Sequence, residues 1–370
     1  MRHLNWILFL LILTGCHPES QLIPPETPAP STVLPSPFPP RPTPQPSATI
    51  LLDTVVESAA GTGEKGFQDG PAELATFNRL GSICHDPNSG ELYILDTHKV
   101  RKLGLDGQIT TVAGQEESGF QDGPASQSLL NNPIDCIVDQ QGKVYITDAS
   151  NRRIRLLHPN GEIETVAGTG QTSPVIDGIA LKANLVTPYT LDLNAAGILY
   201  FSDAFRIRKL DQGQVTTLNT EQNFVAQKDT GYKNGKIQQA TFGGDLYLGF
   251  DNKDELYISD QKHQVLRKMN AEQVVSDVIG RAARDIDPSL IRPLFIDKLK
   301  QVPGVLIIDA NRLFIVEENS LTLLATAENI ARRGISFDFA FGLSVSPDQW
   351  IYVSESGTNR IKRIQFKQKP

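Results

Sequence analysis

The heptapeptide Gly66-Phe67-Gln68-Asp69-Gly70-Pro71-Ala72 occurs a second time, unchanged, at residues 119–125, which lie 53 positions further along the chain. An identity of seven residues at one fixed separation indicates an internal repeat of about that length. After each copy come an apolar segment, a glycine turn and a strand pattern that ends in aspartate, as in Leu92–Asp96 and Val144–Asp148. A basic strand and a last strand close each period, so the pattern predicts four short strands per repeat.

The acidic residue at the end of the second strand marks the repeats along the rest of the chain. It occurs six times, at intervals of 52, 55, 57, 49 and 46 residues, as Asp96, Asp148, Asp203, Asp260, Asp309 and Glu355. Unit five is degenerate and keeps little beyond Val305–Asp309 and Arg312–Val316. Because a lone four-stranded sheet cannot bury both faces, six units predict an all-β fold, a six-bladed β-propeller of four-stranded antiparallel blades.

The two ends of the repeat region complement each other. Unit six supplies only three strands (343–346, 350–355 and 360–366), whereas one extra strand, at 50–58, precedes the first unit. We expect this N-terminal strand to complete the last blade, because the pairing removes two exposed sheet edges at once. The propeller domain is therefore predicted to span residues 49–370.

The N-terminus has the pattern of an export signal. A short basic start precedes eight apolar residues, Trp6 to Leu13, a run well short of the ~20 residues that a membrane-spanning helix needs. Residues 1–15 are therefore predicted to be a signal peptide. The next motif, Leu13-Thr14-Gly15-Cys16, resembles the bacterial lipobox, and this resemblance implies that Cys16 is lipidated after the signal is cut before it. An ordinary cleaved signal with an incidental cysteine is the alternative.

Residues 16–48 are predicted to be a lipid-bearing cysteine followed by a disordered, proline-rich linker. Residues 17–48 contain twelve prolines and almost no charge, a composition that favours extended polyproline geometry at ~3.1 Å per residue. A passive spacer is expected, although a partner that reads proline-rich ligands is the alternative. The lipobox resemblance implies a lipid-anchored, extracytoplasmic location in the bacterial cell envelope, at the outer membrane or the outer face of the cell membrane.

Charge and motif content exclude several classes of function. The formal net charge is −7 and the basic residues recur inside strands, whereas nucleic-acid binding requires a basic surface. The six histidines are scattered without a zinc-ligand spacing, and neither a phosphate loop nor a Gly-x-Ser-x-Gly elbow occurs. Cys84 and Cys136 fall one position apart in the repeat alignment. Their side chains are therefore predicted to point to opposite faces of equivalent strands, as small core residues without a disulfide.

The second repeat is similar to a known family. Val112–Gly114, the Gly-Phe-x-Asp-Gly-Pro-Ala motif, Tyr145–Asp148 and Asn151–Arg155 resemble the NHL repeat. The resemblance covers roughly residues 50–366. It implies a six-bladed propeller that serves mostly as a binding platform, in bacteria often outside the cytoplasm.

Two sets of repeated polar residues are expected to be structural. The Asp-Gly pairs fit turns, in which aspartate binds nearby backbone and glycine supplies a positive φ. The second-strand acids and third-strand arginines recur once per blade, which fits a repeated internal ion pair or hydrogen-bond network better than one active site. These positions are Asp96, Asp148, Asp203, Asp260, Arg101, Arg155, Arg208 and Arg267.

Polar residues that break the repeat suggest where a ligand binds. The alignment places several of them on the innermost strands, at or near the mouth of the channel along the propeller axis. This candidate ligand-binding set is Ser82, Asp135, Thr190, Asp192, Asp245 and Tyr247. Polar residues wetted by channel water are the alternative. Specificity is expected from the loops that escape the repeat, residues 219–230 and 281–304.

Two functions fit this sequence. The first is a monomeric, non-catalytic binding or scaffold module, without cofactor or nucleic acid, for an envelope protein, peptide or glycan. The second is an enzyme similar to the calcium-dependent six-bladed hydrolases and lyases, with a metal in the channel. Oxygen ligands for calcium would then come from Asp135, Asp192, Asp245 and Asn194.

Overall fold

The computed structural model describes residues 53–219, 232–279, 293–298, 304–309, 312–317, 320–326 and 340–367, all within one compact unit, Pro44–Pro370. The predicted signal peptide, Cys16 and the proline-rich linker lie outside these residues, as does most of the loops 219–230 and 281–304. Within the described part of the chain, no helix has the length and apolar character needed to cross a membrane.

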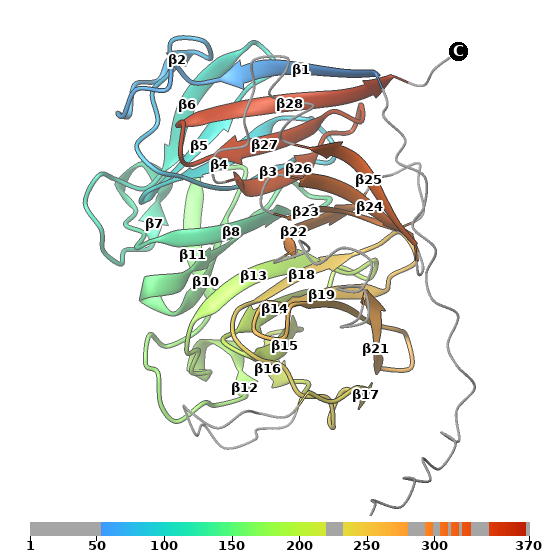
Figure 1. Cartoon of the computed structure of the whole chain (residues 1–370). Coiled ribbons are helices and arrows are strands. Elements are labelled where there is room, and N and C mark those ends of the chain that lie inside the picture. The colour runs from blue at the N-terminus through green and yellow to red at the C-terminus, as the bar shows by residue number, and fades with distance from the viewer. Residues whose placement is uncertain are drawn as a thin grey trace, which may run out of the picture. The chain divides into compact units, whose positions relative to one another are not determined.

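Six antiparallel sheets make up this unit (Figure 1). Their strands in blades one to three are β2 (Gly70–Pro71), β3 (Leu80–His85), β4 (Leu92–Asp96), β5 (Lys99–Leu103), β6 (Gln108–Ala113), β7 (Gly123–Pro124), β8 (Pro133–Val138), β9 (Val144–Asp148), β10 (Arg153–Leu157), β11 (Glu162–Ala167), β12 (Gly178–Ile179), β13 (Pro188–Leu193), β14 (Leu199–Asp203), β15 (Arg206–Asp211) and β16 (Gln214–Thr217). Those of blades four to six are β17 (Gly235–Lys236), β18 (Leu246–Phe250), β19 (Leu256–Asp260), β20 (Val265–Met269), β21 (Val274–Ile279), β22 (Pro293–Lys298), β23 (Val305–Asp309), β24 (Arg312–Glu317), β25 (Ser320–Thr326), β26 (Ala340–Val345), β27 (Ile351–Glu355), β28 (Arg360–Lys367) and β1 (Asp53–Ala60).

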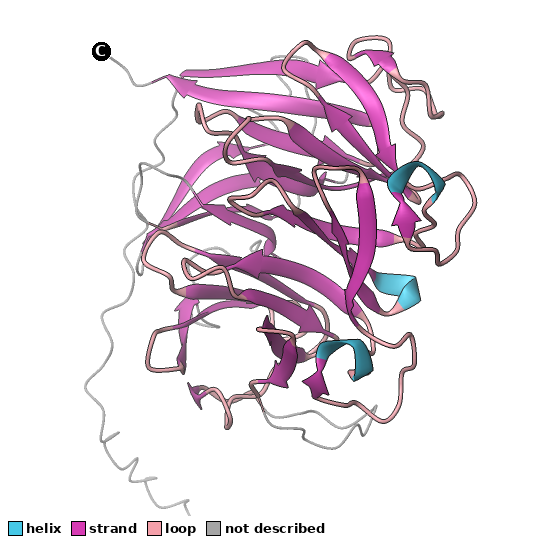
Figure 2. Cartoon of the chain, turned by 180° about the vertical axis from the view of Figure 1, so that it is seen from behind, coloured by secondary structure: helices cyan, strands magenta, loops and turns pink. Residues whose placement is uncertain are grey.

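The innermost strands form a closed ring. β3, β8, β13, β18, β22 and β26 each lie beside the next, and β26 lies against β3. The fold is therefore an all-β six-bladed propeller, as predicted. Helix in the described residues is limited to three short 3₁₀ turns, η1 (Ala125–Gln127), η2 (Ala149–Asn151) and η3 (Ala180–Lys182), as Figure 2 shows.

The first four blades contain a fifth strand that the repeat pattern does not predict. Two residues of the repeated motif pair with the outermost strand, as Gly70 does with Ile109 and Gly123 with Ile163. Gly70 and Gly123 have φ values of 124° and 116°, a conformation that residues with a Cβ rarely adopt. The repeated glycine therefore lets the loop fold back along the blade edge and cover it.

The chain closes the ring with its N-terminal strand, and this prediction is confirmed. β1 pairs with β28 from Asp53↔Lys367 to Ala60↔Ile361, and the sheet order is β1-β28-β27-β26. The sequence predicts this strand at 50–58, and within the described residues it spans 53–60. β28 is consequently an interior strand of blade six, paired on one side with β27 and on the other with β1.

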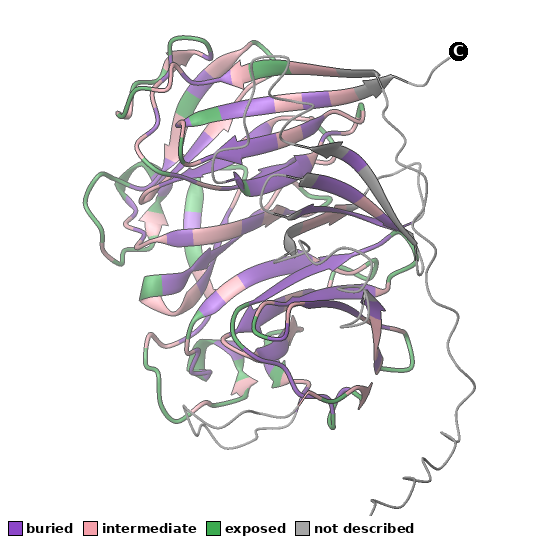
Figure 3. Ribbon diagram, in the orientation of Figure 1, coloured by how far each residue is buried: buried purple, intermediate pink, exposed green. Residues whose placement is uncertain are grey.

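The hydrophobic core lies between neighbouring blades (Figure 3). Side chains alternate across each strand, so each sheet presents one apolar face to the preceding blade and one to the following blade. One cluster joins Leu95 and Val100 of blade one to Leu130 and Ile146 of blade two, and each of these four side chains is at most 1% exposed. Each face of a blade is therefore buried by the blade beside it.

A buried ion pair repeats in blades one to four. The third-strand arginine, fully buried in each blade, contacts the second-strand aspartate. The distances are 3.0 Å for Arg101–Asp96, 2.7 Å for Arg155–Asp148, 2.7 Å for Arg208–Asp203 and 3.5 Å for Arg267–Asp260. Burial raises the pKa of Asp96 and of Asp148, while the arginine and neighbouring N–H groups lower it. The pair holds the second and third strands to the loop of the repeated motif.

The aspartates of the Asp-Gly pairs belong to the same network. Asp69 binds Arg101 at 2.6 Å and accepts the backbone N–H of Thr111 on the fourth strand at 2.7 Å. These aspartates therefore tie the loop to two strands of the blade, in addition to any role in a turn. The motif Gly-Phe-Gln-Asp-Gly therefore recurs because its aspartate binds the buried arginine and its last glycine lets the loop pair with the blade edge.

In blade four the third-strand arginine is Arg267, and the second carboxylate of its network stands on the fourth strand instead of in the loop. Asn234 occupies the loop position of Asp69, and Asp277 occupies the fourth-strand position of Thr111, since Arg267↔Asp277 pairs as Arg101↔Thr111 does. Asn234 accepts from the Arg267 guanidinium at 2.7 Å and donates to Asp277 at 2.7 Å. The network of blade four thus keeps a second carboxylate near the arginine, and the fourth strand supplies it instead of the loop.

Candidate functional site

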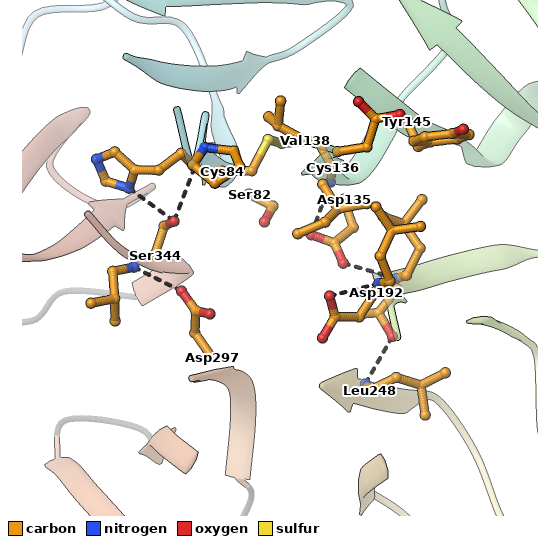
Figure 4. A pocket seen from close by; sticks show the side chains of 18 of the residues that line it. Ser82, Cys84, Asp135, Cys136, Val138, Tyr145, Asp192, Leu248, Asp297 and Ser344 are labelled. Atoms are coloured by element: carbon orange, nitrogen blue, oxygen red, sulfur yellow. Dashed lines mark hydrogen bonds between the residues drawn. A yellow bond between two sulfur atoms is a disulfide. The ribbon is translucent and has the colours of Figure 1, made fainter. Parts of the chain in front are cut away.

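A cavity of about 500 Å³ lies among the innermost strands (Figure 4). Strands β3, β8, β13, β18, β22 and β26 all contribute residues to its wall. The turns between the innermost and second strands, including residues 139–141 and 194–197, line one end of it. Its size lies within the range of ordinary ligand pockets, so this channel is the candidate functional site.

Most of the residues selected from the sequence line this cavity. Ser82, Asp135, Thr190 and Tyr247 each precede the residue that pairs with the middle of the second strand, which puts them at one level. These four residues line the cavity together with Asp192 and Asn194. Asp245 is exposed, directly precedes β18 and is absent from the cavity lining. The structure therefore brings five of the six selected residues to one site.

Side chains around the channel connect each blade to the next. Three aspartates and one serine accept a backbone N–H from the innermost strand of the following blade. The contacts are Asp135 Oδ2 to Leu191 N at 3.0 Å, Asp192 Oδ2 to Phe250 N at 2.7 Å, Asp297 Oδ2 to Val345 N at 2.7 Å, and Ser344 Oγ to His85 N at 3.1 Å. The innermost strands of neighbouring blades are not joined in one sheet. These bonds therefore satisfy backbone groups at the contacts between neighbouring innermost strands, here called the joints.

Two further channel residues contribute to the joints. Thr190 Oγ1 accepts the N–H of Leu248 at 3.1 Å and donates to the carbonyl of Leu246 at 3.0 Å. The Tyr189 and Tyr247 hydroxyls lie 3.2 Å apart, with their rings at 89°. Burial raises the pKa of Tyr247 well above its ordinary range, so this hydroxyl keeps its proton and acts as a hydrogen-bonding group.

Asp135 is the channel group whose charge changes near neutral pH. It lies deep in the domain, although part of its side chain faces the cavity. Burial raises the pKa of Asp135 to about 6, against the lowering effect of hydrogen bonds from Ser82, Leu191 and Cys136; nearby Asp192 raises it further. Its folded-state pKa is above the unfolded value, so this carboxyl gains its negative charge as the pH rises through about 6.

The channel also contains a serine–histidine pair. Ser344 Oγ lies 3.0 Å from His85 Nδ1, and the His85 ring packs edge-on against Tyr352 with centroids 4.6 Å apart. Burial lowers the pKa of His85 to about 3, although Asp348 acts in the opposite direction. A general base works best when its pKa is near the operating pH. His85 is therefore a weak base, and the pair serves the joint between blades six and one.

Cys84 and Cys136 form a disulfide, so the prediction that they stay unpaired is wrong. Their Cα atoms are 5.9 Å apart and the bond joins β3 of blade one to β8 of blade two. The two residues do occupy opposite faces of equivalent strands, but in a ring those two faces meet. Cys84 faces blade two, whereas Cys136 faces blade one, and both belong to the same core cluster.

The disulfide closes a long loop at the channel wall. The two cysteines are 52 positions apart, and a cross-link over a loop of that length is worth about 4 kcal/mol in the chain-entropy model. Both residues line the cavity. This covalent link holds the joint between blades one and two. A disulfide also agrees with an oxidising compartment.

The described residues do not assemble the calcium set of the enzyme alternative. Among them, no group of three or more His, Cys, Asp or Glu side chains is arranged to hold a metal ion. Asp135 and Asp192 each use both carboxylate oxygens for backbone N–H groups, and Asp245 lies outside the cavity lining. The arrangement can accept hydrogen bonds from a ligand in the channel.

Comparison with known proteins shows partial similarity. No family model matches the chain. It is 25% identical over 283 residues to the protein Suppressor of quenching 1, chloroplastic, of Arabidopsis thaliana, which covers 70% of this chain and 26% of that protein. It is 28% identical over 337 residues to Teneurin-4 of Homo sapiens, covering 84% of this chain and 11% of that protein. The chain thus spans about a quarter or less of these relatives.

Solved structures share the fold at low sequence identity. A gluconolactonase from Xanthomonas campestris matches 85% of this chain and 90% of its own length, with a TM-score of 0.56 and 9% identity. Virginiamycin B lyase from Staphylococcus aureus matches 85% of this chain and 100% of its own, with a TM-score of 0.53 and 12% identity. At such identity these neighbours establish the six-bladed fold alone.

Proposed function

We propose that this protein is a non-catalytic binding module of the NHL-repeat type, with its ligand site in the channel. One observation carries this proposal: the acidic and hydroxyl groups of the channel are engaged in joining the blades. Asp135, Asp192 and Asp297 each accept an N–H from the next blade. A rigid wall whose carboxylate oxygens keep acceptor capacity suits the binding of a ligand with hydrogen-bond donors.

The cellular setting belongs to the same proposal. The lipobox-like motif at Cys16, the proline-rich linker and the disulfide together support a lipid-anchored protein on the outer side of a bacterial membrane. Its ligand would then be an envelope protein, peptide or glycan, held by a monomeric propeller. The propeller would be the binding module of this lipid-anchored chain.

The alternative is a hydrolase or lyase of the six-bladed type, favoured by the fold shared with gluconolactonase and virginiamycin B lyase. An assay for substrate turnover distinguishes the binding module from the enzyme. Purified full-length protein is expected to leave a sugar lactone and a streptogramin B antibiotic at their uncatalysed rates, with or without added Ca²⁺ or Mg²⁺. The measurement is substrate loss by liquid chromatography.

The control in that assay is the double variant Asp135→Asn/Asp192→Asn. Under the binding proposal neither the natural protein nor the double variant turns over either substrate. Metal-dependent turnover by the natural protein that disappears in the double variant would replace the binding proposal with the enzyme.

A further inference from the structure

The hairpin turns at the two ends of the propeller differ in charge in the described residues. Consecutive turns of an antiparallel blade lie at opposite ends of the sheet. In the five blades whose turns are described, the turns from innermost to second strand contain seven acidic and two basic residues: Asp86, Glu91, Asp139, Asp251, Asp254, Glu255 and Asp348 against Lys143 and Lys253.

The hairpin turns at the opposite end have the reverse composition, although the connections between blades at that end also carry acidic residues, and Glu116 lies 3.5 Å from Lys99. The turns from second to third strand, with the first residue of the third strand, contain six basic residues and no acidic one in the same five blades. These residues are Lys99, Arg152, Arg153, Arg206, Lys262 and Arg360. The cavity is lined by turns of the acidic end. A ligand that enters there meets a negative potential.

The cavity wall continues this acidic character inward. Its described charged residues are Asp135, Asp139, Asp192 and Asp297 against a single lysine, Lys143. The negative charge of Asp192 raises the pKa of Asp135. In Figure 4, Asp297 lies across the hollow from Asp135 and Asp192. Low-dielectric walls lined by one sign of charge concentrate the field inside a cleft.

The wall geometry favours an organic cation over a metal ion. Ca²⁺ needs six to eight oxygens at ~2.3–2.6 Å, whereas the described residues contain no group of three or more His, Cys, Asp or Glu side chains arranged to hold a metal ion. Each carboxylate oxygen of Asp135 and Asp192 accepts one N–H and still has a lone pair for a further donor. An ammonium or guanidinium group supplies three to five N–H donors, and charge-assisted bonds to carboxylate are among the strongest. Tyr145 and Tyr247 add aromatic and hydroxyl surface to the lining.

We propose that the channel binds an organic cation, whose ammonium or guanidinium group lies among Asp135, Asp192 and Asp297. This inference rests on the proposed binding function and names the class of its ligand. The group would belong to a small polyamine-like molecule or to a lysine or arginine side chain of a peptide. A cavity of about 500 Å³ accommodates either.

The test is isothermal titration calorimetry of the full-length protein with spermidine, agmatine, the tripeptide Gly-Lys-Gly, glucose, sodium glutamate and calcium chloride. We expect binding of the amines or of the tripeptide and none of glucose or glutamate. Comparison of spermidine and agmatine with Gly-Lys-Gly identifies the source of the cationic group. Lowering the pH from 7.5 to 5 should weaken binding severalfold, because Asp135 takes up a proton while the amines stay charged.

Two substitutions test the location. Asp297→Asn in the wall and Asp139→Asn at the mouth each remove one charge and keep a side-chain oxygen acceptor; each should weaken binding about tenfold. The control is Asp106→Asn, an exposed turn residue outside the cavity lining that accepts the N–H of Gln108 at 3.1 Å. It should bind as the natural protein does, and melting curves verify that all variants fold.

The outcomes distinguish this inference from the function it rests on. Binding of calcium without the amines, or equal affinity in all three variants, would overturn the cation site. Binding of glucose or glutamate alone would do the same and leave the channel a binding site. Turnover of a lactone or streptogramin would overturn both.

Discussion

Deletion of residues 49–58 should destroy most of the stability of the propeller. The deletion removes most of β1 and exposes the edge of β28, whose Ile361 and Ile364 are fully buried. The deletion removes the backbone partners of β28 from Lys362 to Lys367. At about 1 kcal/mol per lost hydrogen bond, this loss is a large part of the stability of a typical domain. The measurement is thermal unfolding followed by circular dichroism, with gel filtration to detect association through the exposed edge.

The matched control for this deletion removes ten residues of the linker, 30–39. These residues belong to the predicted spacer, so their loss should leave the melting temperature unchanged. A β1 deletion that melts like the linker deletion would contradict closure of the ring by the N-terminal strand.

Replacement of Arg155 by Met should destabilise the protein by about 3–5 kcal/mol. Arg155 is fully buried and binds Asp148 at 2.7 Å and Asp122 at 2.6 Å, as well as two backbone carbonyls. Methionine fills part of the volume but leaves the buried Asp148 carboxylate without its cation. Urea unfolding gives the difference in free energy.

The same variant should show a characteristic dependence on pH. Burial already raises the pKa of Asp148, and loss of Arg155 removes a contribution that lowers it. The folded-state pKa then rises further above the unfolded value, so the deficit of the variant grows as the pH rises and shrinks in mild acid. Arg153→Met is the control, because Arg153 lies over the half-exposed Phe120 ring at 3.7 Å. It should cost at most about 1 kcal/mol. Equal losses in the two variants would contradict the structural role of the network.

The elements predicted correctly are those that recur. The period, the blade count and closure by the N-terminal strand follow from patterns that six units share, even where unit five is degenerate. The ion-pair residues Asp96 and Arg101 could be selected because each blade repeats their positions. Repetition makes them visible, and burial of a charged pair in each blade explains why the positions recur.

The elements that were missed depend on contacts between blades. Cys84 and Cys136 seemed incompatible because an alignment superposes the units, whereas the ring turns opposite faces of successive units toward each other. Asp297 and Ser344 were not selected, since their neighbours in the next blade cannot be read from one unit. Register alone could have indicated them, because both sit two positions beyond the level of Asp135, where blade three has Asp192. Asp245 was selected for its charge, although it precedes the strand that lines the cavity.

The most direct test of the central claim is to block the channel at its rim. Ala196 is exposed and lines the cavity, so Ala196→Trp should obstruct the mouth without disturbing the core. Leu105→Trp places the same side chain on an exposed turn that does not line the cavity. Immobilised full-length protein, natural and variant, would be exposed to envelope extract, and the retained components quantified by mass spectrometry. We predict a component that the natural protein and Leu105→Trp retain and Ala196→Trp loses; identical retention by all three would contradict a binding site in the channel.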